Sequence, residues 1–353
     1  MQIGIDANEA NIVSRVGVGQ YAFNIIWELY RQDTVNTYHL YLKQSPLSDL
    51  PPQRPNWTYH IFGPGKMWTK LALPFRLYTQ KTKLDLFFSP SHYSPHFSPF
   101  ATIPTIHDLG YLQSLNQFNK KDIYQLTNWT RHSIKQAHHI VAVSQFTKNE
   151  INRIYQVPLD KITVAPNGVE QVPTYTSKET KAVLTKFKIN QPYLLTVGTL
   201  KPNKNIPFLL SAFAKTKHKL LVIAGKKGWL FDDIFAKVEL LQLEDRVIFT
   251  DYITQDEKWI LLKNALVSVL TSTYEGFGIP AIESLKVGTP IIASDIPAYQ
   301  EILGDSVRLI DPTKESELVA SLQHLPKFKS TSIVDKYTWA NSARILIQTF
   351  NKV

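Results

Sequence analysis

Residues 275–283 read EGFGIPAIE, a segment in which two glutamates bracket a pair of glycines and a proline. The apolar run VSVL at 267–270 comes just before it and has the length of a buried strand. Pro280 suits the first turn of a helix, where its missing N–H is not needed. The segment therefore predicts a strand, then a glycine loop, then the start of a helix.

A unit of this kind is a good place to hold a phosphorylated sugar. In open α/β sheets, ligands bind beyond the carboxyl ends of the strands, where helix starts direct free N–H groups at anions. Gly276 and Gly278 let the backbone approach a ligand closely. Glu275 and Glu283 can each accept hydrogen bonds from two vicinal hydroxyls, so one could hold a hexose and the other a ribose. Taken alone, a solvated Glu275 and a Glu283 that favours the helix dipole would explain the same residues.

Apolar runs and segments of helical periodicity alternate along the rest of the chain, which indicates an α/β fold with parallel, doubly wound sheets. The length of 353 residues fits two domains. The polar segment 171–180 is the expected linker, so we expect an N-terminal domain at 1–172 and a C-terminal domain at 173–337. The other expected strands lie at 3–6, 38–42, 57–61, 85–90, 103–108, 140–144, 164–169, 193–198, 221–225, 246–253, 290–294 and 307–312.

Composition narrows the class of protein. No apolar run approaches the ~20 residues of a membrane span, and no signal peptide is recognisable, so a cytoplasmic protein is expected. The absence of cysteine excludes disulfides, thiol catalysis and Cys-ligated zinc, and no His/carboxylate cluster has metal spacing, so we expect neither metal nor cofactor. The net charge of +10 indicates an anionic partner. We expect no nucleic acid, because no recognised binding module accompanies the basic residues.

Two further segments are suited to phosphate. Gly17 and Gly19 precede a segment of helical spacing, but a lone G-x-G lacks the third glycine and the acidic residue expected of a nicotinamide site. Gly198 follows a predicted strand, and Lys204 lies just before a predicted helix, where its charge could neutralise a phosphate. A solvated lysine would explain Lys204 equally well.

These segments together resemble the retaining glycosyltransferases of family 4, the group 1 glycosyl transferases with the two-domain GT-B fold. The resemblance rests on the Glu-x7-Glu segment at 275–283 and on GVG at 17–19, TIHD at 105–108, SQFT at 144–147 and PNKN at 202–205. It spans nearly the whole chain. It implies two Rossmann-like domains that face each other across a cleft, with a C-terminal helix at 338–353 packing back on the first domain.

The resemblance also implies roles for individual residues. The expected catalytic residues are His107, which contacts the donor sugar or the acceptor hydroxyl, Lys204, which binds the diphosphate, and Glu275, which positions the transferred sugar. Asn203 replaces the usual arginine of the family, so Lys201 or Lys226 would complete the diphosphate site. The expected substrate-binding residues are Gly17, Gly19, Asp108, Gly198, Asn203, Tyr252, Ile253, Gly276, Phe277, Gly278, Ile279 and Glu283.

The function implied is transfer of a hexose, mannose as the first choice, from a GDP- or UDP-sugar to a hydroxyl of a glycan or lipid-linked acceptor in cell-surface polysaccharide synthesis. Glucosyl or N-acetylhexosaminyl transfer from a UDP-sugar is an alternative. A glycoside hydrolase using the glutamate pair and a non-catalytic subunit that binds sugar nucleotides are two others.

Residues 66–78 read KMWTKLALPFRLY and are followed by Lys81 and Lys83. A helix that combines aromatic and basic residues in this way can bind anionic lipid at a membrane surface, here the inner face of the plasma membrane. Pro74 is expected to interrupt the helix. A surface helix packed on its own domain would explain the same residues.

Overall fold

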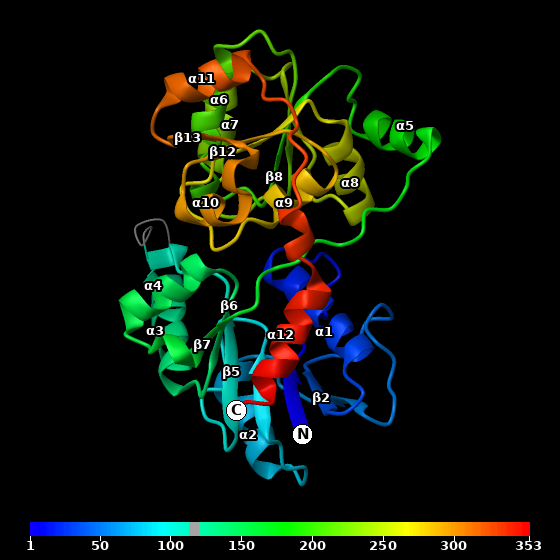
Figure 1. The fold of residues 1–353 in the computed structure, drawn as a ribbon, viewed down its shortest axis with the longest axis vertical. Coiled ribbons are helices and arrows are strands. Elements are labelled where there is room, and N and C mark those ends of the chain that lie inside the picture. Colours follow the sequence, from blue (N-terminus) through cyan, green and yellow to red (C-terminus); the bar gives the residue numbers. More distant parts are fainter. Residues whose placement is uncertain (113–119) are drawn as a thin grey trace. The chain divides into compact units, whose positions relative to one another are not determined.

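The computed structural model describes residues 1–112 and 120–353, and the chain divides into two compact units (Figure 1). Unit 1 comprises Met1–Gly168 together with Tyr337–Val353, and unit 2 comprises Val169–Lys336. Each unit is built around one parallel sheet, so the predicted pair of doubly wound α/β domains is confirmed. No helix in the described ranges combines the length and the apolar character needed to cross a membrane.

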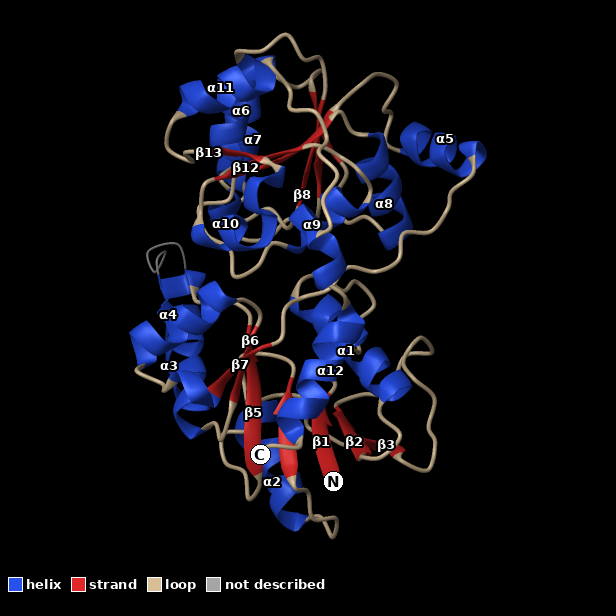
Figure 2. Cartoon of the chain, in the orientation of Figure 1, coloured by secondary structure: helices blue, strands red, loops and turns tan. Residues whose placement is uncertain are grey.

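Unit 1 contains a seven-stranded sheet in the order β3-β2-β1-β4-β5-β6-β7. All of its strand pairs are parallel, and most of its strand residues are buried, because helices cover the sheet (Figure 2). The strands are β1 (Gln2–Asp6), β2 (Thr37–Leu42), β3 (Trp57–Ile61), β4 (Leu86–Ser89), β5 (Ala101–Ile106), β6 (Ile140–Ala142) and β7 (Ile162–Val164). The helices are α1 (Val18–Gln32), α2 (Leu73–Thr79), α3 (Lys120–Gln136), α4 (Gln145–Tyr155) and α12 (Trp339–Phe350).

The last helix of the chain, α12, belongs to unit 1 and packs on α1. The Trp339 ring meets the Tyr21 ring edge-on at 6.0 Å, and the Phe350 ring lies 5.3 Å from that of Phe88 in β4. A Cβ atom on Gly168 would lie only 2.1 Å from the backbone nitrogen of Trp339, so this contact requires glycine. The end of the chain is therefore part of the core of the first unit.

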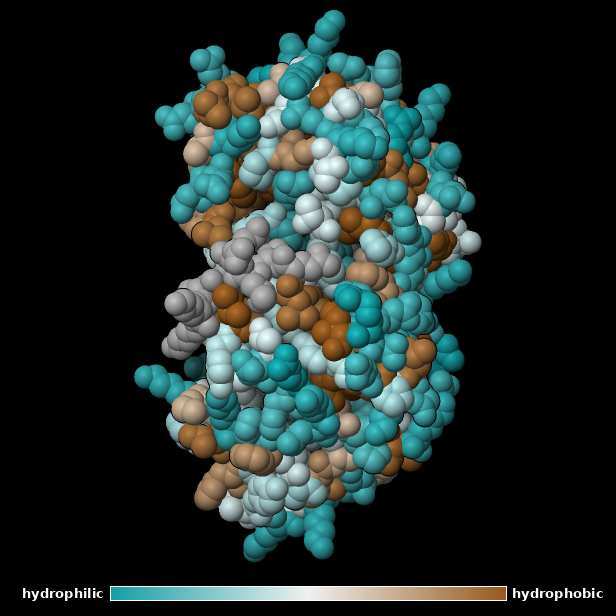
Figure 3. Space-filling view, turned by 90° about the vertical axis from the view of Figure 1, so that its left-hand side faces the viewer, coloured by the Kyte–Doolittle hydropathy of each residue, from teal (hydrophilic) through white to brown (hydrophobic). Residues whose placement is uncertain are grey.

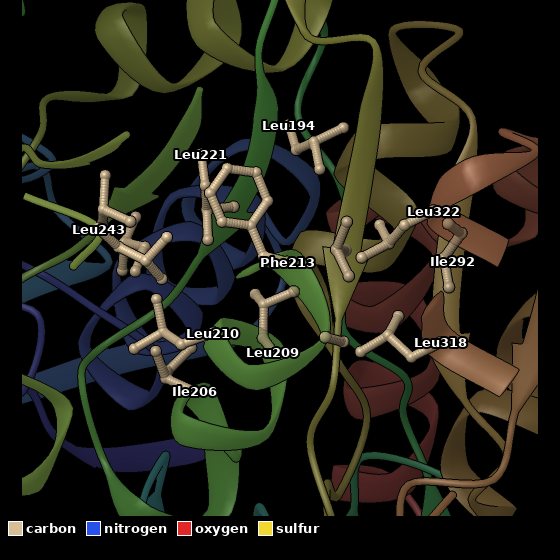
Figure 4. Close-up of a cluster of buried hydrophobic side chains, with 14 of the residues drawn as sticks. Leu194, Ile206, Leu209, Leu210, Phe213, Leu221, Leu243, Ile292, Leu318 and Leu322 are labelled. Atoms are coloured by element: carbon tan, nitrogen blue, oxygen red, sulfur yellow. The ribbon is translucent and has the colours of Figure 1, made fainter. Parts of the chain in front are cut away.

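Unit 2 contains a six-stranded parallel sheet in the order β10-β9-β8-β11-β12-β13. A core of leucine, isoleucine, valine and phenylalanine side chains from α6, α7, α11 and the strands fills one side of this sheet (Figure 4). The strands are β8 (Leu194–Val197), β9 (Leu221–Ala224), β10 (Val247–Phe249), β11 (Val267–Leu270), β12 (Ile291–Ser294) and β13 (Arg308–Ile310). The helices are α5 (Ser177–Lys186), α6 (Ile206–Ala214), α7 (Asp232–Leu240), α8 (Gln255–Asn264), α9 (Ile279–Lys286), α10 (Pro297–Leu303) and α11 (Glu315–Gln323).

In both units the first six strands follow the order 3-2-1-4-5-6 of a dinucleotide-binding fold. The order reverses between β1 and β4 in unit 1 and between β8 and β11 in unit 2. Ligands of open α/β sheets bind at such a switch point, outside the carboxyl ends of the two strands. The segment 275–283 follows β11 directly and runs into α9, which confirms the predicted strand, loop and helix.

Two segments show detail beyond the expectation. The helical segment 68–79 divides just before Pro74, because a π-helical turn at Trp68–Ala72 ends there and the proline lies in the first turn of α2. The segment 171–180 is not an irregular linker throughout, since α5 begins at Ser177. Thr176 caps this helix and forms a capping box with Glu179, a pattern that is readable in the sequence.

Candidate functional site

Lys204 and Glu275 form an ion pair at the switch point of unit 2. Lys204 follows β8, Glu275 follows the neighbouring β11, and the Nζ–Oε1 distance is 2.6 Å. The Ser272 hydroxyl donates a second hydrogen bond of 2.6 Å to the same carboxylate oxygen. Both charged side chains are mostly buried, with 20% and 13% of their surfaces exposed. The predicted cation and one of the predicted carboxylates therefore contact each other directly.

The two loops that carry this pair are joined by hydrogen bonds. The Asn203 amide donates to the Tyr274 carbonyl at 3.1 Å, and the Thr273 N–H donates to the Asn203 carbonyl at 2.8 Å. The Thr271 hydroxyl donates to the Lys204 carbonyl at 2.9 Å. Asn203 thus uses its side chain to connect the loops, where the resemblance leads one to expect a second cation.

Two glycines make room for the pair. A Cβ atom on Gly198 would lie 3.2 Å from Cε of Lys204, so the lysine side chain lies directly over this glycine. Gly278 has a φ of 98°, and a Cβ there would lie 2.4 Å from the Tyr299 ring. Tyr299 is buried, and its burial together with the nearby Glu275 carboxylate raises the pKa of its hydroxyl well above the usual value. These residues line a narrow pocket, whose walls are Thr196, Val197, Gly198, Lys204, Ile206, Ile223, Leu270, Thr271, Ser272, Pro280 and Tyr299.

Glu283 lies in α9 and is also ion-paired. Its carboxylate contacts Nζ of Lys258 from α8, and the two side chains are only 5% and 12% exposed. Between the two glutamates, Phe277 is buried in the core of the unit and Ile279 is half-buried. Gly276 is buried as well. Each of the two predicted carboxylates is therefore held by its own lysine.

The turn after β10 carries Tyr252 and Ile253. Tyr252 is 37% exposed, but its N–H donates to the Asp251 side chain at 2.8 Å, so that N–H is already bonded within the protein. Thr254 caps α8 directly after this turn. The turn therefore leads into a capped helix, and it places an exposed aromatic ring at the carboxyl end of the edge strand.

The predicted residues of unit 1 lie at the carboxyl ends of its own strands. Gly17 has a φ of 48° and caps α1, and no atom lies within 4 Å of the position of a Cβ. Gly19 does have a close neighbour, since its Cβ would lie 3.0 Å from the Glu9 carbonyl. Glycine is thus favoured at position 17 by the backbone conformation and at position 19 by the close approach of another backbone segment.

His107 follows β5 and is buried, and its Nε2 lies 3.1 Å from the Pro90 carbonyl. Burial, with a smaller contribution from His92, lowers the pKa of His107 to about 3, so the ring is neutral near pH 7. The Asp108 carboxylate accepts a hydrogen bond from the Gly110 N–H at 2.9 Å and so shapes the following turn.

The comparisons with known proteins cover both halves of the chain. Residues 16–171 match the family described as "Glycosyltransferase Family 4", and residues 177–329 match "Glycosyl transferases group 1". The chain belongs to glycosyltransferase family 4.

This family 4 chain is similar in sequence to two curated bacterial proteins. The chain is 27% identical over 283 residues to "O-antigen chain mannosyltransferase B" of Escherichia coli, an alignment that covers 75% of this chain and 74% of the relative. It is 29% identical over 227 residues to "O-antigen chain mannosyltransferase RfbU" of Salmonella typhimurium, with 63% of this chain and 60% of the relative covered. The second alignment thus spans less than two thirds of the Salmonella protein.

Solved structures share the fold of this family 4 chain. Sucrose-phosphate synthase from Thermosynechococcus elongatus matches with a TM-score of 0.78 and 18% identity over 99% of this chain and 98% of that one. Anabaena Alr3699/HepE in complex with UDP and glucose matches with a TM-score of 0.75 and 16% identity over the full length of both chains. At these identities the likeness establishes the GT-B fold alone.

Three residues around the candidate site were missed by sequence reasoning. Ser272, Lys258 and Tyr299 contact or face the two glutamates, but each lies on a segment whose neighbours are decided by the packing of loops and helices. Lys201, a candidate to replace the missing arginine, has its Nζ 4.4 Å from the centre of the Trp229 ring. Lys226 lies in the loop beside Gly198, since its carbonyl accepts from the Leu200 N–H. In the described ranges, no group of three or more potential metal ligands occurs.

Proposed function

We propose that the protein transfers a hexose, mannose as the first choice, from a nucleoside diphosphate sugar to a hydroxyl of a glycan or lipid-linked acceptor, with retention of the anomeric configuration. The observation that carries the proposal is the Lys204–Glu275 pair beside Gly198 at the switch point of unit 2. The names of the curated relatives support a mannosyltransferase of cell-surface polysaccharide synthesis. The neighbour bound to UDP and glucose supports a nucleotide sugar and keeps a glucosyl or N-acetylhexosaminyl UDP donor as the alternative.

The proposed step is a substitution at the anomeric carbon. The bond from this carbon to the β-phosphate oxygen breaks, and its electron pair stays on the phosphate. The acceptor oxygen forms the new bond on the same face, and the acceptor proton passes to the departing phosphate oxygen. Fixed positive charge is needed where negative charge grows, and Lys204 with the N–H groups of the glycine loop would supply it.

Lys204 is bonded to Glu275, and a diphosphate in this pocket would compete with the carboxylate for its ammonium group. When the diphosphate takes Lys204, Oε1 of Glu275 loses one of its two hydrogen-bond donors and becomes available to a sugar hydroxyl. Binding of the phosphate and positioning of the hexose are in this way coupled. Glu283 would accept from the ribose hydroxyls, and Tyr252 and Ile253 would meet the base.

The residues of unit 1 have proposed roles on the donor and acceptor. Gly17 and Gly19 would let the start of α1 approach the diphosphate. The neutral His107 ring would form a hydrogen bond with the donor sugar or acceptor hydroxyl, and Asp108 would hold the loop that positions this ring. Lys226 is the cation we propose in place of the missing arginine, because its loop runs beside Gly198.

The same protein is proposed to bind an anionic membrane surface through unit 1. Met67, Leu71, Phe75 and Tyr78 recur along one face of the helical segment and are 53–71% exposed. Exposed lysines flank this apolar stripe, at positions 66, 81 and 83. An apolar face with basic neighbours fits anionic lipid, which would bring the enzyme to a lipid-linked acceptor at the inner face of the plasma membrane.

Thermal-shift measurements with UDP, GDP and ADP test the nucleotide site, and transfer from the sugar of the best-binding nucleotide tests the reaction. We expect stabilisation by one nucleotide and transfer to a hydroxyl acceptor with retained configuration. Binding without transfer to any of a panel of acceptors would indicate the non-catalytic subunit. Release of free sugar from an aryl glycoside with no nucleotide present would indicate a glycoside hydrolase.

A further inference from the structure

The ion pair between Lys258 and Glu283 is the least exposed one in the described part of the chain. The two side chains retain only 12% and 5% of their surfaces. Burying an ionised group costs several kcal/mol unless a partner of opposite charge and good geometry compensates. A buried carboxylate at this place therefore depends on Lys258, and the pair cannot be treated as an ordinary surface contact.

The lysine occupies one oxygen of the carboxylate and leaves the other. Lys258 donates to Oε1 of Glu283, and within residues 1–112 and 120–353 no other side-chain hydrogen bond to this carboxylate is found. An ionised carboxylate has about four acceptor positions and no donor. The remaining oxygen of Glu283 can consequently accept from donors that a ligand brings, such as ribose hydroxyls.

The helix that carries Lys258 also begins at the proposed base contact. Tyr252 and Ile253 form the turn before α8, and Thr254 and Glu257 close a capping box at its first turn. Lys186 forms an ion pair with the same Glu257 on the outside of the unit. One rigid helix start thus connects the turn that would meet the base with the lysine that holds the carboxylate.

We propose that Lys258 is a positioning residue for ribose recognition: it holds Glu283 so that the free carboxylate oxygen accepts from the 2′- and 3′-hydroxyls of the nucleotide. This inference rests on the proposed function. Its consequence is selectivity, because a buried acceptor held in one orientation is left without a partner when a hydroxyl is missing. A rigid site of this kind rejects a ligand that lacks the hydroxyl more strongly than a flexible site does.

The test is the affinity ratio between GDP and 2′-deoxy-GDP, and between UDP and 2′-deoxy-UDP, measured by titration calorimetry. For the nucleotide that binds, we expect the wild-type protein to favour the ribose form at least tenfold. Lys258→Met, which keeps the side-chain length and removes the charge, should reduce this preference to less than threefold. Lys186→Met is the matched control, since it removes the more exposed partner of another ion pair of α8, the one with Glu257, and should leave the ratio unchanged.

A purely structural lysine would change stability and overall affinity but not the ratio. A folded Lys258→Met protein with the wild-type ratio would therefore overturn the inference. If this variant does not fold, Lys258→Gln, which still donates a hydrogen bond, should lower the ratio at least threefold, and an unchanged ratio there also overturns it. A wild-type protein that binds no nucleotide contradicts the proposed function itself. Equal binding of the ribose and deoxyribose forms by the wild-type protein contradicts ribose recognition by Glu283, and with it the role of Lys258, but not hexose transfer from a nucleotide sugar.

Discussion

At the scale of single residues, the carboxylate of Glu275 is held by two donors on one oxygen, Lys204 and Ser272. This arrangement fixes the orientation of the Glu275 side chain. It also means that the charge of the Glu275 carboxylate is balanced by that of Lys204. Substitutions here should therefore affect both ligand binding and the free energy of unfolding. The loss of stability should be larger where the partner that is left unpaired is more deeply buried.

Glu275→Ala should lower the transfer rate by about 100-fold or more, because the transferred sugar loses its anchor in the transition state. Lys204 would lose its partner but is 20% exposed, so we expect the free energy of unfolding to fall by about 1–3 kcal/mol. Transfer assays and urea unfolding measure the two effects. Glu317→Ala, which removes an exposed partner of Lys314, is the control and should leave transfer unchanged.

Gly278→Ala should lower the free energy of unfolding by about 2–4 kcal/mol. The φ of 98° is strained for any side chain, and the new Cβ would overlap the buried Tyr299 ring. Gly65→Ala is the control, because a Cβ there would lie at an ordinary contact distance of 3.7 Å from Cδ of Lys43. Equal stability of the two variants in urea would contradict the close packing of Gly278 on Tyr299.

His107 should make the protein less stable in acid. Its pKa is about 3 in the folded state, below the ordinary value of 6.5, because the ring is buried. Between these two pH values the unfolded chain binds a proton that the folded one does not, so stability is lost as the pH falls from 6.5 towards 3, by about 1.4 kcal/mol per pH unit. His107→Gln should show a shallower decline in urea unfolding over this range. Parallel profiles would contradict the buried, neutral ring.

The sequence reveals which residues of the site carry charge but not how they pair. Glu275, Glu283 and Lys204 were recognisable from their spacing and from the strands before them. Lys204 and Glu275 are 71 positions apart, and they meet only because β8 and β11 are neighbours in the sheet. No sequence pattern near Lys258 indicates its partner. Its pairing with Glu283 could not be predicted, because it depends on the packing of α8 against α9.

At the scale of elements, the exposed apolar stripe at Met67, Leu71, Phe75 and Tyr78 is a surface to which the transfer reaction assigns no role. The π-helical turn at Trp68–Ala72 and α2 bury Trp68, Leu73 and Leu77 in unit 1 and leave the opposite face apolar and exposed. The face seen in Figure 3 mixes hydrophilic and hydrophobic side chains. This element is therefore the one to test against lipid.

Replacing Lys66, Lys81 and Lys83 by alanine should weaken binding to phosphatidylglycerol-containing vesicles by about 100-fold at low salt, since each lysine near an anionic surface contributes about 1 kcal/mol. Phe75→Glu should also weaken binding, because it puts a charge into the apolar stripe. Leu240→Glu, at an equally exposed apolar position in unit 2, should bind like the wild type. Flotation that leaves the wild-type protein unbound would refute the membrane proposal.

Elements were easier to predict than their boundaries and their order. The strand at 57–61 is found at the expected residues, and Ser144 caps α4 by accepting a hydrogen bond from the Thr147 N–H. The alternation of strands and helices indicates a parallel sheet but does not say which strands are adjacent. The π-helical turn was not predictable either, because its sequence has ordinary helical spacing.

At the scale of the whole molecule, unit 1 is made from both ends of the chain. Deleting residues 337–353 should destabilise this unit, because Trp339, Leu346 and Phe350 are buried and each such side chain contributes about 1.5–3 kcal/mol. Hydrogen exchange should show lost protection in unit 1 and retained protection in unit 2. Deleting only 351–353, which follow α12, is the control. Equal loss in both units would contradict the division of the chain.

The discontinuity of unit 1 has a consequence for biosynthesis. A nascent chain leaves the ribosome from its N-terminus, so domains ordinarily finish folding in sequence order. Here residues 169–336, nearly half of the chain, emerge complete before α12 has been made, so the apolar surface of α1 that α12 covers is still exposed. Translation would thus release the second unit first, and an arrested or truncated message would yield a chain with that surface open to chaperones and proteases.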